Sequence, residues 1–179
     1  IAIQGIGSAA GRNHEAGKYP IEQLYTPLRS HGGLDQQNSL ERTETISLDK
    51  LLPQSHHLLI EGQPGAGKTT FLKLVAAMLV RDLLKTPHPE GGHWRGKYLG
   101  MHKKESLRHP LFLRLSELAV LLAKDQTPIA NDRRRLLDLL VTSDNASNDP
   151  AWRDHWQTLL NNGQSTLLLD GLDEVADEE

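Results

Sequence analysis

Residues 58–70 of the chain read LLIEGQPGAGKTT, a glycine-rich turn between two apolar segments. The part from Gly62 to Thr69, GQPGAGKT, fits the pattern G-x-x-x-x-G-K-[ST] of a phosphate-binding loop. Glycines let the backbone fold so that successive N–H groups face inward, and no Cβ blocks the approach of phosphate oxygens. The turn therefore predicts a loop that holds the phosphates of a nucleotide.

The segments on both sides of the turn provide the context that this motif requires. Residues 56–62, HHLLIEG, have consecutive apolar positions before a glycine, which predicts a buried strand. Residues 69–85, TTFLKLVAAMLVRDLLK, are apolar on nearly all sides, which predicts a helix buried against a sheet. We expect Lys68 to bridge the β and γ phosphates and the Thr69 hydroxyl to hold Mg²⁺.

Further strands and helices alternate along the rest of the chain. Residues 110–115, PLFLRL, predict a second strand, and STLLLD at 165–170 predicts a third. Between them we expect helices over 117–124, over 133–141 after a cap at Asn131 or Asp132, and over 151–162 with Pro150 in the first turn and Gly163 as its end. This alternation is typical of an α/β protein with a parallel sheet.

Composition limits the possible classes of protein. The chain has 179 residues, no cysteine, a formal charge of −3 and no apolar run near the roughly 20 residues that span a bilayer. These features indicate a cytoplasmic globular domain without disulfides, with no membrane contact and no indication of nucleic-acid binding. We interpret residues 1–45 as an irregular leader with a short strand at IAIQ, and residues 46–179 as the nucleotide-binding part of a longer protein.

A nucleotide loop needs a second oxygen ligand for its metal, usually an acid at the tip of a neighbouring strand. Asp170 follows Leu167, Leu168 and Leu169, so it stands at the end of an apolar strand. An acid after three leucines is by itself a weak signal, because it is usually a solvated strand end or a helix cap. Together with the glycine turn it predicts that Asp170 faces the Mg²⁺ ion.

The residues that follow this aspartate carry the most specific signal. Many ATPases of this group have a glutamate directly after the metal-binding aspartate, whereas Gly171 stands here and the acids return as Asp173 and Glu174. This DGLDE arrangement resembles the NACHT family of signal-transduction NTPases.

Two other segments support the resemblance. LLIEGQPGAGKTTFL at 58–72 is similar to that family's phosphate loop, and PLFLRLSEL at 110–118 is similar to its second-strand segment. The resemblance covers about residues 46–175 and ends after the Walker B segment. It implies the three-layer α/β fold of P-loop NTPases with a parallel sheet, incomplete here because the sensor strand and the C-terminal subdomains would follow.

The resemblance also implies a function. In such a STAND-type switch, ADP holds a closed form, exchange for ATP opens it, and the opened molecules self-associate through the NACHT domain to activate an effector, with hydrolysis as the reset. The implied activating ligand is unknown, and bacterial defence or regulation is the implied setting. Asp173 or Glu174 would polarise the attacking water. The implied nucleotide-binding residues are Gly62, Gln63, Pro64, Gly65, Ala66, Gly67, Lys68, Thr69 and Thr70.

Other functions share the glycine loop. A small-molecule kinase would carry an arginine-bearing lid and an acceptor pocket, and a DNA motor or loader would be favoured by a glutamate in place of Gly171. A binding module that holds ATP without turnover also stays open, and we expect this part of the chain alone to hydrolyse ATP weakly. Residues 25–29, YTPLR, are interpreted either as an adenine contact or as an anchored linker.

Three further features are assigned structural roles. Residues 86–109, with their prolines, glycines and bases, predict an inserted loop. Trp152 and Trp156 recur at helical spacing and predict a packing face. The glycine-rich start of the chain, IAIQGIGSAAG, mimics a dinucleotide-binding turn, but no long apolar helix follows it.

Overall fold

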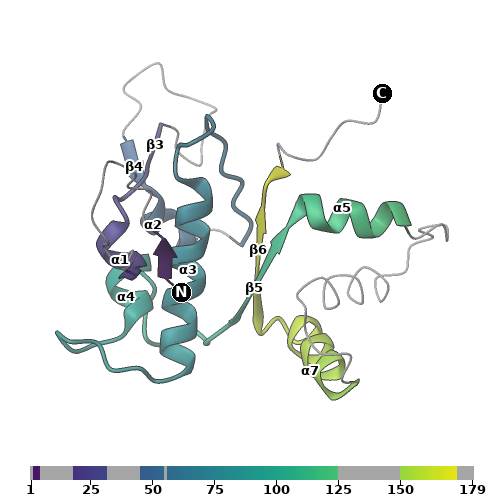
Figure 1. The fold of residues 1–179 in the computed structure, drawn as a ribbon. Coiled ribbons are helices and arrows are strands. Elements are labelled where there is room, and N and C mark those ends of the chain that lie inside the picture. Colours follow the sequence, from purple (N-terminus) through teal and green to yellow (C-terminus); the bar gives the residue numbers. More distant parts are fainter. Residues whose placement is uncertain (1, 5–17, 32–44, 55, 125–149, 173–179) are drawn as a thin grey trace, which may run out of the picture. The chain divides into compact units, whose positions relative to one another are not determined.

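The computed structural model of the chain describes residues 2–4, 18–31, 45–54, 56–124 and 150–172. The fold is mixed α/β, and the chain divides into two compact units, Ile1–Glu105 and Ser106–Glu179 (Figure 1). The first unit contains β1 (Ala2–Gln4), β2 (Lys18–Pro20), α1 (Ile21–Leu24), β3 (Arg29–His31), β4 (Thr45–Ser47), α2 (Leu48–Leu51), η1 (Leu52–Gln54), α3 (Lys68–Leu83) and α4 (Trp94–Leu99). The second contains β5 (His109–Arg114), α5 (Leu115–Lys124), α7 (Pro150–Asn161) and β6 (Ser165–Asp170).

Helix α3 forms the core of the first unit and confirms the helix predicted after the glycine turn. No glycine or proline interrupts it, and nearly every side chain from Phe71 to Leu79 is buried. Leu74 and Met78 are both 0 % exposed, and each contributes about 1.5–3 kcal/mol by its burial. Helices α1 and α4 pack against α3 (Figure 1).

The described residues of the leader form short elements. Strand β1 pairs antiparallel with β2, and β3 pairs antiparallel with β4. Helix α1 places Ile21 in the core at 0 % exposure, and Glu22 forms an ion pair with Arg81 of α3. The strand predicted at IAIQ is confirmed, and the division between residues 45 and 46 stays a prediction.

The segment before the glycine turn differs from the expectation. Residues 56–62 were predicted as a buried strand, but the structure has no helix or strand there, and Leu59 is 70 % exposed. An extended run becomes a strand only when a neighbour satisfies its backbone groups. No strand in the described ranges pairs with residues 58–60, so the strand assignment is wrong.

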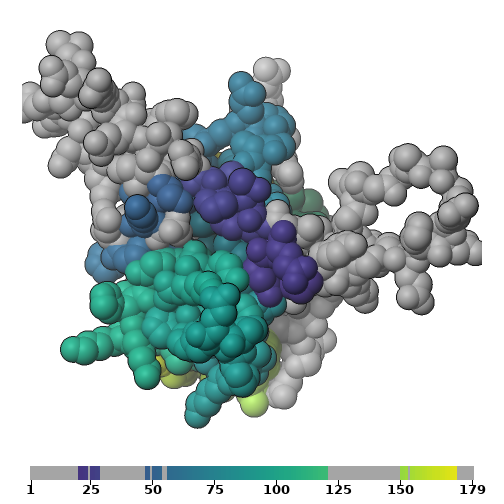
Figure 2. All heavy atoms as spheres, turned by 90° about the vertical axis from the view of Figure 1, so that its left-hand side faces the viewer, coloured from purple at the N-terminus to yellow at the C-terminus, as the bar shows by residue number. Residues whose placement is uncertain are grey.

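The segment predicted as an inserted loop, 86–109, is instead packed against α3 through α4. Trp94 and Leu99 are 7 % and 0 % exposed, and the Asp82 carboxylate of α3 accepts hydrogen bonds from the backbone N–H groups of Trp94 and Arg95 at 2.8 and 3.2 Å. Figure 2 shows this segment and the residues around α1 on one face of the unit. The loop prediction missed α4, whose first turn is capped twice: the His93 ring nitrogen accepts from the N–H of Gly96 at 2.9 Å, and the distant Asp82 carboxylate accepts from the N–H groups of Trp94 and Arg95.

The second unit confirms the two later strands. Strands β5 and β6 pair in parallel, with Leu111 opposite Leu167 and Arg114 opposite Asp170. Helix α7 ends at Asn161. Gly163 follows with φ of 65°, and its N–H donates to the carbonyl of Leu160 at 3.2 Å before the chain enters β6. The core of this unit comprises Leu111, Leu113, Leu118, Trp156 and Leu159.

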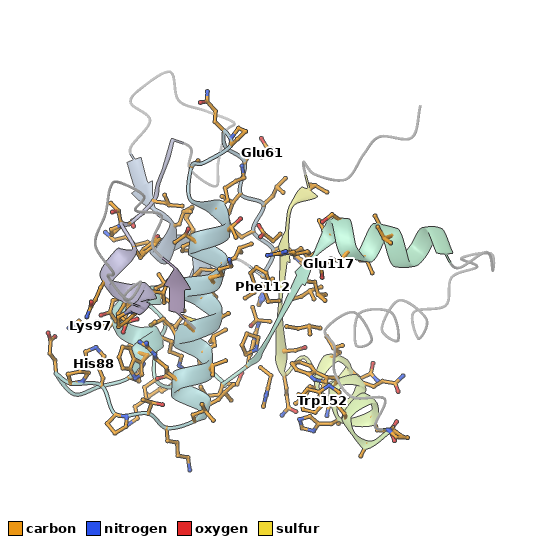
Figure 3. All side chains as sticks on the ribbon, in the orientation of Figure 1. Glu61, His88, Lys97, Phe112, Glu117 and Trp152 are labelled. Carbon is orange, nitrogen blue, oxygen red and sulfur yellow. The ribbon has the colours of Figure 1, made fainter. Side chains whose placement is uncertain are left out.

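The predicted tryptophan face is half confirmed. Trp156 packs in this core at 9 % exposure, whereas Trp152 is 40 % exposed and lies on α7 (Figure 3). The helix expected over 133–141 lies outside the described residues. Of the predicted parallel sheet, the structure describes one strand pair, β5 and β6, with helices α5 and α7 in the same unit. The complete three-layer P-loop fold stays a prediction.

No helix in the described ranges is both long and apolar enough to cross a membrane.

Candidate phosphate-binding site

The glycine turn forms a compact loop at the start of α3. The N–H of Ala66 donates to the carbonyl of Gln63 at 3.1 Å, which closes a tight turn. Gly65 and Gly67 have φ of 79° and 87°, in the region that side chains with a Cβ rarely adopt. The spacing of these glycines therefore matches the two backbone positions that require them.

Lys68 folds back over this loop. Its Nζ donates to the carbonyl oxygen of Gly62 at 2.5 Å and to that of Gln63 at 3.3 Å. The ammonium group is thus held beside the turn rather than extended into solvent. A positive charge at this place is suited to attract the oxygens of a polyphosphate.

Helix α3 begins at Lys68, with Gly67 as its N-cap residue. The N–H of Phe71 donates to the carbonyl of Gly67 at 2.9 Å, which is the first bond of the helical ladder. Gly67 has no side chain to cap the helix, so the backbone at this end and the positive end of the helix dipole face the loop. Thr69 and Thr70 stand in the first turn and are half-buried.

The loop is open to ligands from its outer side. Residues 62–66 are exposed, and the exposure drops to intermediate from Gly67 to Thr70. Glu61 projects from the chain just before the loop (Figure 3). The nine residues that were predicted to bind nucleotide thus form the loop from Gly62 to Gly67 and the first three residues of α3.

Leu28 is a neighbour of the loop that the sequence did not identify. A Cβ built on Gly67 would lie 3.3 Å from Leu28 Cδ2, so the leucine side chain rests against this glycine. The backbone around Leu28 is fixed by Tyr25 and Leu48, which agrees with the anchored-linker interpretation of residues 25–29. The apolar character of Leu28 within YTPLR was the signal in the sequence that could have indicated a packing contact.

The predicted metal ligand Asp170 is the last residue of β6. It is half-buried, lies opposite Arg114 in the strand register and is followed by Gly171 with φ of 77°. The left-handed glycine turns the chain directly after the carboxylate. The two predicted catalytic acids, Asp173 and Glu174, lie outside the described residues.

The glycine loop belongs to the first unit and Asp170 to the second. Their meeting at one Mg²⁺ ion therefore stays a prediction. Within the described ranges, no group of three or more His, Cys, Asp or Glu side chains forms a cluster that could hold a metal. A Mg²⁺ site would instead use a threonine hydroxyl, a single carboxylate and ligand oxygens, which is the oxygen-rich donor set that this ion prefers.

Comparison with known proteins identifies the family. Residues 37–179 match the family model described as Nephrocystin 3, N-terminal. No curated protein and no solved structure matches the chain significantly. The matched region is more than half of the chain and includes both the glycine loop and β6. The chain therefore belongs to the Nephrocystin 3, N-terminal family.

Proposed function

We propose that residues 62–70 bind the polyphosphate of ATP or ADP together with Mg²⁺, and that this site operates a signalling switch of the NACHT type. The observation that carries the proposal is the loop itself. Two glycines with positive φ shape the turn, and the ammonium of Lys68 lies beside it at the start of a buried helix. Together these features supply backbone donors, a fixed positive charge and the helix dipole.

The residues of the chain have distinct tasks in this proposal. The loop N–H groups hold the phosphate oxygens, and Lys68 exchanges its carbonyl partners Gly62 and Gln63 for these oxygens. Thr69 and Asp170 are the proposed ligands of Mg²⁺, which would neutralise charge on the phosphates. Asp173 or Glu174 orients a water molecule, since phosphoryl transfer depends mainly on positioning and electrostatics.

The switch is the further part of the proposal. Binding of ADP would keep the protein closed, and exchange for ATP would allow self-association and activation of an attached effector in response to a ligand not yet identified. The DGLDE segment, with Gly171 after the metal aspartate, supports this class over a DNA motor and over a small-molecule kinase. We place the protein in the cytoplasm, in defence or regulation.

A binding measurement tests the nucleotide site. We expect MgATP to bind the chain in isothermal titration calorimetry, and Lys68→Ala to lower the affinity by about 100-fold or more, or about 3 kcal/mol. Lys103→Ala is the matched control, because Lys103 is an exposed lysine of the same unit far along the chain from the loop. Absence of MgATP binding in the unaltered chain would contradict the proposal.

Turnover tests the catalytic assignment separately. In a longer form of the protein that hydrolyses ATP, the double variant Asp173→Ala and Glu174→Ala should retain ATP binding and lose most of its hydrolysis. Phosphate release under saturating MgATP is the measurement. Unchanged hydrolysis in the double variant would remove these acids from the mechanism and leave the binding site in place.

A further inference from the structure

Leu28 makes a contact that distinguishes Gly67 from the other glycines of the loop. The Cδ2, Cδ1 and Cγ atoms of Leu28 lie 3.3, 3.7 and 4.0 Å from the position that a Cβ on Gly67 would occupy. The corresponding positions at Gly62 meet only Ala66 and Lys68, which belong to the loop itself, and nothing lies within 4 Å at Gly65. Within the described residues, Gly67 is thus the loop glycine that a side chain from outside the loop supports.

The backbone of Leu28 is held on both sides. Its N–H donates to the phenol oxygen of Tyr25 at 3.1 Å, and its carbonyl accepts from the N–H of Leu48 at 3.0 Å. Leu48 is itself buried at the start of α2. The backbone that carries the Leu28 side chain is therefore anchored on both sides of the residue.

Tyr25 extends this support to the next turn of α3. Its ring centroid lies 6.1 Å from that of Phe71, which is 1 % exposed. Phe71 is bonded through its N–H to the carbonyl of Gly67. Residues 25–28 thus contact both ends of the first hydrogen bond of α3, one through Leu28 and the other through Tyr25.

We infer that Leu28 is a positioning residue for the phosphate loop. This inference rests on the proposed function. A loop that must gather several N–H groups around a polyphosphate loses conformational entropy on binding, and a loop already held in that shape loses less. Leu28 limits the movement of Gly67, the left-handed residue where the loop becomes the helix.

Support of Gly67 by Leu28 has a consequence that a direct contact between Leu28 and the adenine base would not have. Because Leu28 acts through Gly67, its removal weakens the binding of every ligand that fills the loop with phosphates, whatever else the ligand carries. A leucine that contacted adenine would affect ATP and leave inorganic tripolyphosphate unchanged. The ratio of the two affinity losses therefore separates positioning from base recognition.

The test compares MgATP with magnesium tripolyphosphate in calorimetric titrations of the chain. Leu28→Ala should weaken both ligands by about the same factor, on the order of tenfold, or about 1.4 kcal/mol. Leu28→Met, which keeps the volume of the side chain, should restore most of both affinities. Leu84→Ala serves as the matched control, since Leu84 is 72 % exposed at the other end of α3.

Each outcome decides the matter. Loss of MgATP binding alone, or unchanged affinity for both ligands in folded Leu28→Ala, overturns the inference while the proposed function stands. If Leu28→Ala does not fold, Leu28→Val replaces it with the same expected ratio, and equal affinities to the unaltered chain overturn the inference. Failure of the unaltered chain to bind either ligand refutes the proposed function, and the inference with it.

Discussion

The Nζ atom of Lys68 lies 2.5 Å from the carbonyl oxygen of Gly62, so the lysine closes the glycine loop upon itself. This exposed contact contributes little to stability, because water competes for both groups. We expect Lys68→Ala to change the free energy of unfolding by less than about 1 kcal/mol. A ligand at 100 times its dissociation constant should stabilise the unaltered chain by about 2.7 kcal/mol, and the variant, with about 100-fold weaker binding, by about 0.4 kcal/mol or less.

Thermal unfolding with and without MgATP measures both quantities. Lys103→Ala should keep the full ligand-induced rise in melting temperature, because its side chain is exposed and lies outside the loop. A ligand-induced rise of equal size in Lys68→Ala would show that the ammonium takes no part in binding. A large loss of stability without ligand would show that the contact with Gly62 mainly supports the fold.

The sequence was sufficient to predict the helices and strands that are determined by residues close together in the chain. Helix α3 is mostly apolar and follows a glycine turn, and β5 and β6 have short apolar runs between polar residues, so their positions followed from the sequence. Helix α4 did not follow, because its six residues include a glycine and its first turn depends on Asp82 of another helix as well as on the His93 side chain. The loop geometry was predictable for the same reason as α3, since glycines stand where φ is positive.

Partners distant in the sequence account for the other differences. The run at 58–60 has the composition of a strand, but a strand depends on a neighbour that the run itself does not specify. The support of Gly67 by Leu28 joins residues that are far apart in the chain, and no periodicity indicates it. The leader and the loop could be described separately from the sequence, but their contact needed the structure.

The ion pair between Glu22 and Arg81 predicts sensitivity to acid. Burial alone would raise the pKa of the Glu22 carboxyl, but the hydrogen bond and charge of Arg81, at 2.7 Å, outweigh it and lower the pKa. A carboxyl with a lowered folded-state pKa stabilises the protein above its unfolded-state pKa, and this contribution is lost as the pH falls through the folded-state pKa. We expect Glu22→Gln to cost about 1–2 kcal/mol at about pH 7 and clearly less at about pH 3, below the unfolded-state pKa.

Urea unfolding of both proteins at the two pH values measures this difference. Glu90→Gln is the matched control, because Glu90 pairs with Lys97 on the exposed surface, with 73 % of the Glu90 side chain accessible (Figure 3 labels Lys97). Solvent screening should leave little effect of that substitution at either pH. A stability difference for Glu22→Gln that is the same at both pH values would exclude the carboxylate charge as its cause.

The C-terminal end of α3 offers a stabilising substitution. Lys85 has φ of 52°, and its N–H and that of Thr86 donate to the carbonyls of Asp82 and Arg81 at 3.0 and 2.9 Å, which is the Schellman pattern of a helix end. A residue with a Cβ is strained in this left-handed conformation, whereas glycine is not. Lys85→Gly should raise the free energy of unfolding by about 0.5–1 kcal/mol, an effect visible in urea titration.

A control in the same helix separates this effect from the loss of a lysine. Lys73→Gly lies inside α3, where glycine costs about 1 kcal/mol relative to alanine, so it should destabilise the protein. Opposite signs for the two substitutions would confirm that backbone conformation decides the result. Destabilisation by Lys85→Gly would show that the lysine side chain makes a contribution larger than its strain.

The carboxylate of Asp82 joins α3 to α4. Its oxygens accept from the N–H groups of Trp94 and Arg95, and the Arg95 guanidinium lies 3.6 Å from one of them. Asp82→Ala should cost about 2–4 kcal/mol, because it leaves buried donors and a buried guanidinium without this acceptor. Asp82→Asn keeps one oxygen acceptor and should cost less. Amide hydrogen exchange of residues 94–99 is the measurement, and unchanged protection in Asp82→Ala would show that α4 is held by its packing and its His93 cap without this carboxylate.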